Sequence, residues 1–174
     1  MIDLAGMRSV RVDPIRRTAR AEGGATWGDF DRETQAFSLA TTGGSVSDTG
    51  IAGLTLGGGL GWLAGKYGLS CDNLLSVDLV TADGTVLIAS ATENADLFWG
   101  LRGGGGNFGV AASLEYQLHS VGLMLGGLII HPLEQAAELF RFYEEFTREA
   151  PDAFGSNILF VTSPEGQRVV AVAV

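Results

Sequence analysis

The sequence predicts a globular protein of mixed α and β structure, and three observations support this prediction. First, 46% of the residues are hydrophobic and 18% are charged, which is ordinary for a folded domain. Second, stretches that alternate apolar and polar residues end at proline or glycine turns, a pattern typical of antiparallel hairpins. Third, segments with helical spacing lie between these stretches. With 174 residues, the chain is long enough for one domain and the start of another.

Charge and cysteine content exclude several classes of function. The formal net charge is −9, and nucleic acid is not an expected partner because phosphate surfaces need clustered Lys and Arg. Anionic ligands must instead be held by backbone groups or by a few local cations. Cys71 is the only cysteine, which rules out an internal disulfide and makes the cytoplasm the expected location. Apolar stretches such as residues 121–130 are too short and glycine-rich to cross a bilayer, so no membrane span is expected.

The first half of the chain predicts two hairpins and a helix. Turn signals at Asp13-Pro14 and at Asp83-Gly84 each join two strand patterns. Thr26 is a suitable helix N-cap, and acidic residues follow it in the first turn. The expected elements are strands at residues 10–13, 18–22, 74–82 and 85–89 and a helix over residues 27–36.

The second half predicts a short helix, a strand and then a change of character. Asn94 is expected to cap a helix that ends at Leu101. After Gly122, Pro132 is expected to begin a long amphipathic helix through Glu149. Strands are expected at residues 110–118, 128–130, 157–161 and 169–174. Because the chain begins abruptly and its last strand runs to the end, we expect sequence to be missing at both ends.

Glycine is the outlier of the composition, with 26 residues that cluster between residues 43–68 and 100–109. The spacing Gly104-x-Gly106-x-x-Gly109 formally matches the dinucleotide fingerprint, but here a helix enters and a strand leaves, so a Rossmann site is rejected. Residues 49–55 offer successive backbone N–H donors without large side chains, which suits an anion such as a pyrophosphate. Tight packing alone is the alternative explanation for these glycines.

Four ordered blocks carry a resemblance to a known family. They are GGSVSDTGIAGLTLGGGLGW at 43–62, KYGLSCDNLLSV at 66–77, ADG at 82–84 and DLFWGLRGGGGNFGV at 96–110. Together they closely resemble bacterial berberine-bridge-enzyme-like FAD-linked oxidases of the vanillyl-alcohol oxidase superfamily. The resemblance implies an α+β fold: residues 1–122 as the second subdomain of a PCMH-type FAD-binding domain, and residues 123–174 as the beginning of an antiparallel-sheet substrate domain.

The resemblance also implies where FAD is bound. The backbone of residues 49–53 is expected to approach the pyrophosphate and ribityl chain, and Asn73 to lie by the flavin ring. Gly109 and Val110 are expected to bind FAD through backbone groups toward its adenosine end. The expected cofactor-binding residues are therefore Thr49, Gly50, Ile51, Gly53, Asn73, Gly109 and Val110.

Departures from the family pattern limit what this chain is expected to do. The family's Arg-Gly-Gly-Gly-His-Ser type loop, whose histidine is commonly joined to the flavin, does not occur, so the covalent anchor is absent from this chain. Val46 stands where some members have a second flavin-linked cysteine, and Cys71 is expected to be a buried small residue.

No catalytic residue is assigned to this chain. The family's catalytic tyrosine and base come from regions beyond residue 174, which makes the tyrosines here poor candidates; these are Tyr67, Tyr116 and Tyr143.

The sequence therefore predicts the FAD-binding portion of an FAD-dependent oxidoreductase. The family removes a hydride from an alcohol or amine carbon of a small-molecule substrate and passes it to flavin N5. For this chain alone we expect weak or no FAD binding and no turnover. The alternative is a non-catalytic module that binds a partner protein or forms a homo-oligomer through its exposed core surface. A saccharide-binding β-solenoid is disfavoured because no repeat is visible.

Overall fold

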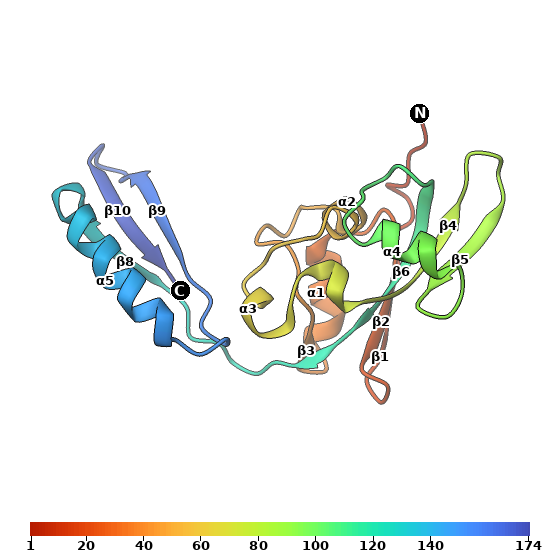
Figure 1. The fold of residues 1–174 in the computed structure, drawn as a ribbon, viewed down its shortest axis with the longest axis horizontal. Helices are drawn as coiled ribbons and strands as arrows, with labels where there is room; N and C mark the ends of the chain where they lie inside the picture. Colours follow the sequence, from red (N-terminus) through yellow and green to blue (C-terminus); the bar gives the residue numbers. More distant parts are fainter. The chain divides into compact units, whose positions relative to one another are not determined.

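A five-stranded antiparallel sheet is the centre of residues 1–122 in the computed structural model, which describes residues 1–174 (Figure 1). The strand order is β1-β2-β6-β4-β5, so β6 lies between two hairpins that are far apart in sequence. The strands are β1 Val10–Asp13, β2 Thr18–Glu22, β4 Leu74–Val80, β5 Val86–Ser90 and β6 Val110–Gln117. The two predicted hairpins and the strand that joins them are confirmed.

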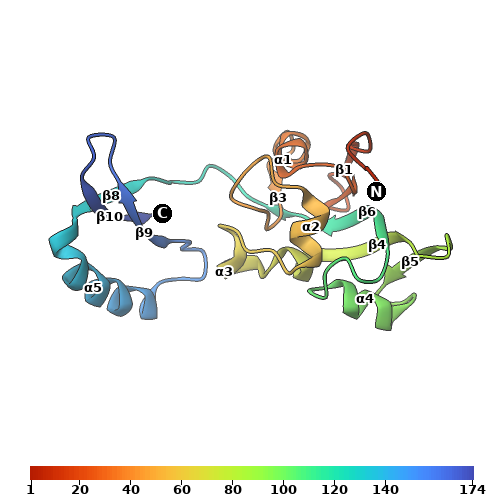
Figure 2. The same ribbon diagram turned by 90° about the horizontal axis from the view of Figure 1, so that it is seen from above.

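Short helices connect the strands. They are α1 Trp27–Gln35, α2 Ile51–Leu56, α3 Ala64–Tyr67, the 3-10 turn η1 Ser70–Asn73 and α4 Ala95–Leu101. Two further short strands, β3 Leu39–Ala40 and β7 His119–Ser120, pair antiparallel with each other. The arrangement brings β7, the last element of this unit, back beside the segment that leads into the first glycine cluster (Figure 2).

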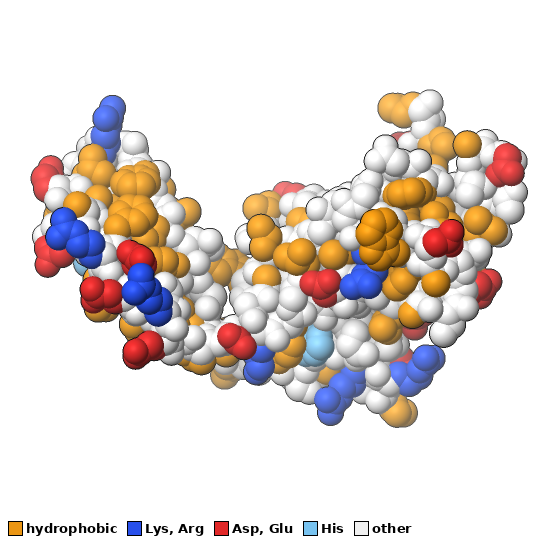
Figure 3. All heavy atoms as spheres, in the orientation of Figure 1, with side chains coloured by type: hydrophobic (Ala, Val, Ile, Leu, Met, Phe, Trp, Pro, Cys, Tyr) orange, Lys and Arg blue, Asp and Glu red, His pale blue; other side chains and the backbone are white.

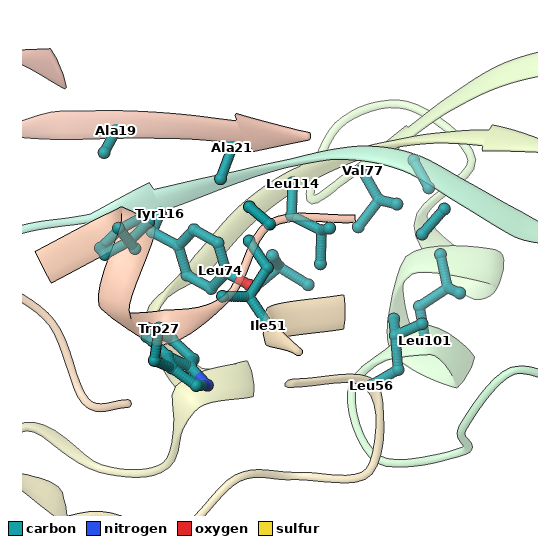
Figure 4. Close-up of a cluster of buried hydrophobic side chains, with 14 of the residues drawn as sticks. Ala19, Ala21, Trp27, Ile51, Leu56, Leu74, Val77, Leu101, Leu114 and Tyr116 are labelled. Atoms are coloured by element: carbon teal, nitrogen blue, oxygen red, sulfur yellow. The ribbon is translucent and has the colours of Figure 1, made fainter. Parts of the chain in front are cut away.

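One hydrophobic core joins the inner face of the sheet to α1, α2 and α4. Its centre is an aromatic cluster of Trp27, Phe30 and Tyr116, whose rings meet edge to face with centroids 5.2 to 5.9 Å apart. Ile51 of α2 lies against the same cluster (Figure 4). Edge-to-face contacts add to the free energy gained from burying these large rings, so the cluster fixes α1 and α2 on the sheet.

The start of α1 is fixed by a capping box. The Asp29 backbone N–H donates to Thr26 Oγ1 at 3.3 Å, and the Asp29 carboxylate accepts the Thr26 backbone N–H at 3.0 Å. Arg8 adds an ion pair to the same carboxylate at 2.7 Å. These contacts satisfy orphan N–H groups at the helix start, as the sequence predicts for Thr26.

Residues 123–174 form a second compact unit. Its sheet has the order β8-β10-β9 with antiparallel pairing, and α5 packs on one face through a stack of Phe140 on Phe160. The elements are β8 Leu128–Pro132, α5 Ala136–Glu149, β9 Asn157–Thr162 and β10 Arg168–Ala173. β10 is buried, whereas the flanking strands expose apolar side chains. Figure 3 shows hydrophobic side chains gathered on the surface of this unit.

Two predicted helix starts differ from the structure. Pro132 ends the edge strand β8, where its missing N–H is tolerated, and a 3-10 turn at Leu133–Gln135 precedes α5. Asn94 does occupy the N-cap position of α4, but it has a left-handed backbone with φ 49°. Its side chain donates to the Ile88 carbonyl at 2.7 Å, so it makes no capping bond. No helix of the protein has the length and hydropathy that a bilayer span requires.

We predict that Asp29→Ala lowers the free energy of unfolding by about 1 kcal/mol, because it removes the acceptor of the capping box. The Thr26 backbone N–H, helped by Arg8, lowers the pKa of Asp29 from 3.8 to about 2. This carboxylate therefore stabilises the fold fully above about pH 3.8, and its contribution is lost as the pH falls toward 2. Urea unfolding at pH 7 and pH 2.5 measures both effects.

The exposed α1 residue Glu33 provides the control, since Glu33→Ala should change the free energy of unfolding by less than about 0.5 kcal/mol. Equal stability of the Asp29→Ala and native proteins at pH 7 would contradict the prediction.

Candidate functional site

The first glycine cluster packs backbone against backbone. A Cβ at Gly61 would lie 1.8 Å from the carbonyl oxygen of Gly43, and a Cβ at Gly43 would lie 2.5 Å from the Trp27 ring. Ser70 Oγ donates to the neighbouring Thr42 carbonyl at 2.8 Å. Tight packing therefore accounts for Gly43 and Gly61, the explanation that the sequence left open.

Gly50 and Gly53 are different, because added Cβ atoms there would meet open space. Both residues are exposed, at the start of α2. Packing therefore does not explain why these two positions lack side chains. The exposed backbone at these positions leaves room for a ligand to approach.

The row of N–H donors expected over residues 49–55 is only partly free. Thr49 donates to the Val46 carbonyl, Ile51 to the Ala25 carbonyl and Leu54 to the Gly50 carbonyl. The N–H groups of Gly50, Ala52 and Gly53 make no hydrogen bond within the protein, and neither do those of residues 43–48 just upstream. Leu54 is engaged because residues 51–56 fold as helix α2, whereas Thr49 is engaged in a turn and Ile51 in the isolated bridge between Thr26 and Gly50.

The two glycine clusters meet at the end of α2. The Leu56 carbonyl accepts hydrogen bonds from the N–H groups of Gly103 and Gly105, at 3.0 and 2.8 Å. Arg102 Nε donates to the Cys71 carbonyl at 2.9 Å, and the guanidinium forms an ion pair with Asp72 at 3.3 Å. These contacts hold the second cluster beside the first and beside η1.

Gly109 has a packing role of its own. Its φ is 149°, and a Cβ there would lie 2.5 Å from the Val80 carbonyl oxygen. Val110 follows as the first residue of β6 and pairs with Val80. Because α4 enters this segment and β6 leaves it, the rejection of a Rossmann site is confirmed.

Asn73 is buried, and its side chain is held on three sides. Nδ2 donates to the Tyr67 carbonyl at 2.9 Å and to the Leu69 carbonyl at 2.8 Å, while Oδ1 lies 2.7 Å from His119 Nε2. The His119 ring stacks on Tyr67 with centroids 3.9 Å apart. Burial, and then the positive charge of Lys66, lowers the pKa of His119, which favours the neutral imidazole. Sequence reasoning missed this role of His119, because no motif links it to Asn73.

Three buried polar atoms beside the first glycine cluster have no hydrogen-bond partner: Trp27 Nε1, Thr41 Oγ1 and Thr42 Oγ1. Unsatisfied buried polar groups cost free energy and often mark the place of a ligand or bound water. The free N–H row of residues 43–48, 50, 52 and 53 belongs to the same segment of this acidic chain, so unpaired polar groups gather there. Successive free backbone N–H groups suit an anionic ligand such as a phosphate.

The cysteine and two of the tyrosines are buried or hydrogen-bonded within the protein. Cys71 is 5% exposed, and burial raises the pKa of its thiol, in line with the expected small buried residue. Tyr116 is fully buried, which raises its pKa, and its hydroxyl bonds Thr55 at 2.7 Å. Tyr143 Oη contacts Ser156 Oγ at 2.7 Å within the second unit. Val46, in contrast, is 62% exposed beside the free N–H row.

Comparison with protein families matches the FAD binding domain over residues 1–90. The FAD-linked oxidoreductase pgmH of Aspergillus terreus is 48% identical over 122 residues, which are 70% of this chain and 25% of the relative. The (R)-6-hydroxynicotine oxidase of Paenarthrobacter nicotinovorans is 43% identical over 130 residues, 74% of this chain and 28% of the relative.

Solved structures extend the likeness to the whole chain. The 6-hydroxy-D-nicotine oxidase of Arthrobacter nicotinovorans superposes with a TM-score of 0.91 at 36% identity, over 99% of this chain and 39% of the other. The berberine-bridge-enzyme-like protein 28 of Arabidopsis thaliana gives 0.91 at 30% identity, over 99% and 36%. The fold class and family predicted from the four blocks are confirmed. The chain spans 25% and 28% of the length of the two curated relatives named above.

We predict that Thr55→Val lowers the free energy of unfolding by about 1 to 3 kcal/mol, because it leaves the buried Tyr116 hydroxyl without a partner. The double variant Thr55→Val with Tyr116→Phe removes both polar groups and should be more stable than Thr55→Val alone. Chemical denaturation of the native protein, the single variants Thr55→Val and Tyr116→Phe, and the double variant measures the difference. A double variant that loses the full sum of the two single losses would refute a specific bond between these groups.

Proposed function

Since the chain belongs to the FAD binding domain family, among berberine-bridge-enzyme-like proteins of the vanillyl-alcohol oxidase superfamily, we propose that it forms the FAD-binding portion of an FAD-dependent oxidoreductase. The observation that carries this proposal is the row of unpaired N–H groups beside Gly50 and Gly53, whose Cβ positions face open space. A chain with a net charge of −9 offers few cations for a pyrophosphate, so backbone donors are the available means.

Each expected site residue receives a role in this proposal. Gly50 and Gly53 offer free N–H groups and close approach to the pyrophosphate. Thr49 and Ile51 already use their N–H groups, and these bonds to residues 46 and 25 hold the segment in place. Thr41 and Thr42 add buried hydroxyls that lack partners.

The remaining site residues act at the two ends of the cofactor. Gly109 and Val110 would bind the adenosine end through backbone groups, since Gly109 lets the chain pass close to β4. Asn73 would lie by the flavin ring. Both of its amide hydrogens are engaged, so the side chain can offer the ring only a remaining lone pair on Oδ1 and its packing surface.

Bound FAD would supply the hydride acceptor, flavin N5, for a hydride from an alcohol or amine carbon. The part of this chain is to bind the cofactor, orient it and exclude water around it. We propose that residues 123–174 begin the substrate domain, where a small molecule is recognised, and that the catalytic groups lie outside this chain. The single buried cysteine supports a cytoplasmic location as part of the proposal.

The second candidate is a non-catalytic module that binds a partner protein or a second copy. One observation favours it: β8 and β9 leave apolar side chains largely exposed, among them Leu128 at 61% and Phe160 at 61%. Large apolar patches of this kind often mark interaction surfaces.

We predict that the chain binds FAD weakly but saturably and that Gly53→Leu weakens binding at least about tenfold by filling the open space beside the N–H row. The variant should remain folded, because no atom lies within 4 Å of the new Cβ position. Flavin fluorescence titration measures affinity, and circular dichroism checks folding.

Gly6→Leu is the matched control, since a Cβ at Gly6 also meets open space. It should leave FAD affinity unchanged. Equal affinities of native chain and Gly53→Leu would overturn the proposed site, and tight stoichiometric retention of FAD would overturn the expectation of weak binding.

The two candidate functions also predict different particle sizes and absorption spectra for the protein. As an FAD-binding portion, the chain mixed with excess FAD should give a flavin absorption band that comigrates with protein. A flavin-free oligomer, measured by light scattering with an absorption scan, is the result expected of the second candidate.

A further inference from the structure

The amide of Asn73 has a defined orientation. Its two hydrogens are both used, by the carbonyls of Tyr67 and Leu69 at 2.9 and 2.8 Å. Only Nδ2 can donate, so the atom that faces His119 at 2.7 Å must be the acceptor Oδ1. The opposite orientation would place Oδ1 against two carbonyl oxygens.

This orientation fixes the tautomer of His119. Because Oδ1 accepts, Nε2 must carry the hydrogen, and the neutral ring then keeps its lone pair on Nδ1. The ring is also held from its face, since Tyr67 stacks on it with an interplanar angle of 11° and Lys66 Nζ lies 5.2 Å from the Tyr67 centroid. His119 thus contacts both Asn73 and Tyr67, which are themselves joined by the bond from Asn73 Nδ2 to the Tyr67 carbonyl.

The network closes the first glycine cluster. Tyr67 ends α3, Gly68 follows with φ 75°, and Leu69 precedes η1. Ser70 and Cys71 then donate to the carbonyls of Gly59 and Gly58. The turn that Asn73 holds, Tyr67 to Leu69, is therefore followed directly by two residues that are bonded back onto the glycine segment after α2.

His119 itself comes from a distant part of the chain. It lies in β7, which pairs with β3 directly before Thr41 and Thr42. The His119–Asn73 bond therefore ties the far end of the glycine segment to the strand pair at its start.

We propose that His119 is a positioning residue: by donating from Nε2 to Asn73 and stacking on Tyr67, it holds the Tyr67–Leu69 turn, and through that turn the glycine segment, in the arrangement that receives FAD. The last step rests on the proposed function. The contacts of His119 with Asn73 and Tyr67, called the clamp below, are a property of the chain without cofactor. The clamp and its effect on FAD binding can therefore be tested separately.

Two substitutions of His119 separate its hydrogen bond to Asn73 from its stacking on Tyr67. His119→Phe keeps an aromatic ring for Tyr67 but has no donor for Asn73. His119→Gln keeps an N–H donor and loses the ring. His131→Phe is the control, because His131 lies in the second unit and contacts Gln135 there. All are made in the full 174-residue chain.

The first measurement uses the chain without FAD. Long-range proton–nitrogen NMR should show His119 as the Nε2–H tautomer. Hydrogen exchange of the amides of Gly68, Ser70, Cys71 and Asp72 should be about tenfold faster in His119→Phe, the change expected from losing one buried hydrogen bond. His119→Gln should restore most of the protection, and His131→Phe should change nothing.

The second measurement is FAD titration. His119→Phe should weaken binding about tenfold and His119→Gln by less, following the exchange data. An Nδ1–H tautomer, unchanged exchange in His119→Phe, or no rescue by His119→Gln would each overturn the clamp. If His119→Phe does not fold, the NMR signal of the native chain and the Gln variant still decide. If the exchange result holds but the native chain shows no saturable FAD binding, the proposed function fails and the clamp stands without its last step.

Discussion

The hydrogen bond between Thr55 and Tyr116, enclosed by the aromatic cluster, is the contact on which the rest of the first unit depends. Both groups are fully buried, so water cannot replace the bond. Tyr116 comes from the central strand β6, Thr55 comes from α2, and Trp27 and Phe30 of α1 enclose the pair. The position of α2 sets where the free N–H groups at its start are presented. A dry core contact thus determines the geometry of a polar surface.

Glycine serves two separate purposes in this chain, and the structure separates them. At Gly43, Gly61 and Gly109 neighbouring atoms leave no volume for a side chain, so glycine is a requirement of folding. At Gly50 and Gly53 the volume is present and unused. The first group builds a rigid scaffold by close backbone packing, and the second leaves part of that scaffold accessible. Residues of one type, a few positions apart, therefore act in opposite ways.

Local patterns predicted much of this fold. The hairpin at residues 10–22 and the capping box at Thr26 follow from short-range rules and hold in the structure, because turn and cap chemistry acts over a few residues. The roles of Asn94 and Pro132 were not predicted correctly, because a bond to the Ile88 carbonyl in β5 of the preceding hairpin and a position in an edge strand decide their conformations. The four motif blocks identified the family correctly, and the FAD site that they imply stays a prediction. Which N–H groups stay free, and the link from His119 to Asn73, depend on tertiary contacts that no spacing rule contains.

The burial of Cys71 makes its thiol a probe of local opening. Its thiol is the only one in the chain, it is buried, and its carbonyl accepts a bond from Arg102 where the two glycine clusters and η1 meet. With a raised pKa, the thiol stays protonated and unreactive while this region is closed. Alkylation of Cys71 under native conditions therefore requires local opening. The rate at which Cys71 is alkylated therefore gives the equilibrium for local opening of the region where the two glycine clusters meet η1, separately from global unfolding.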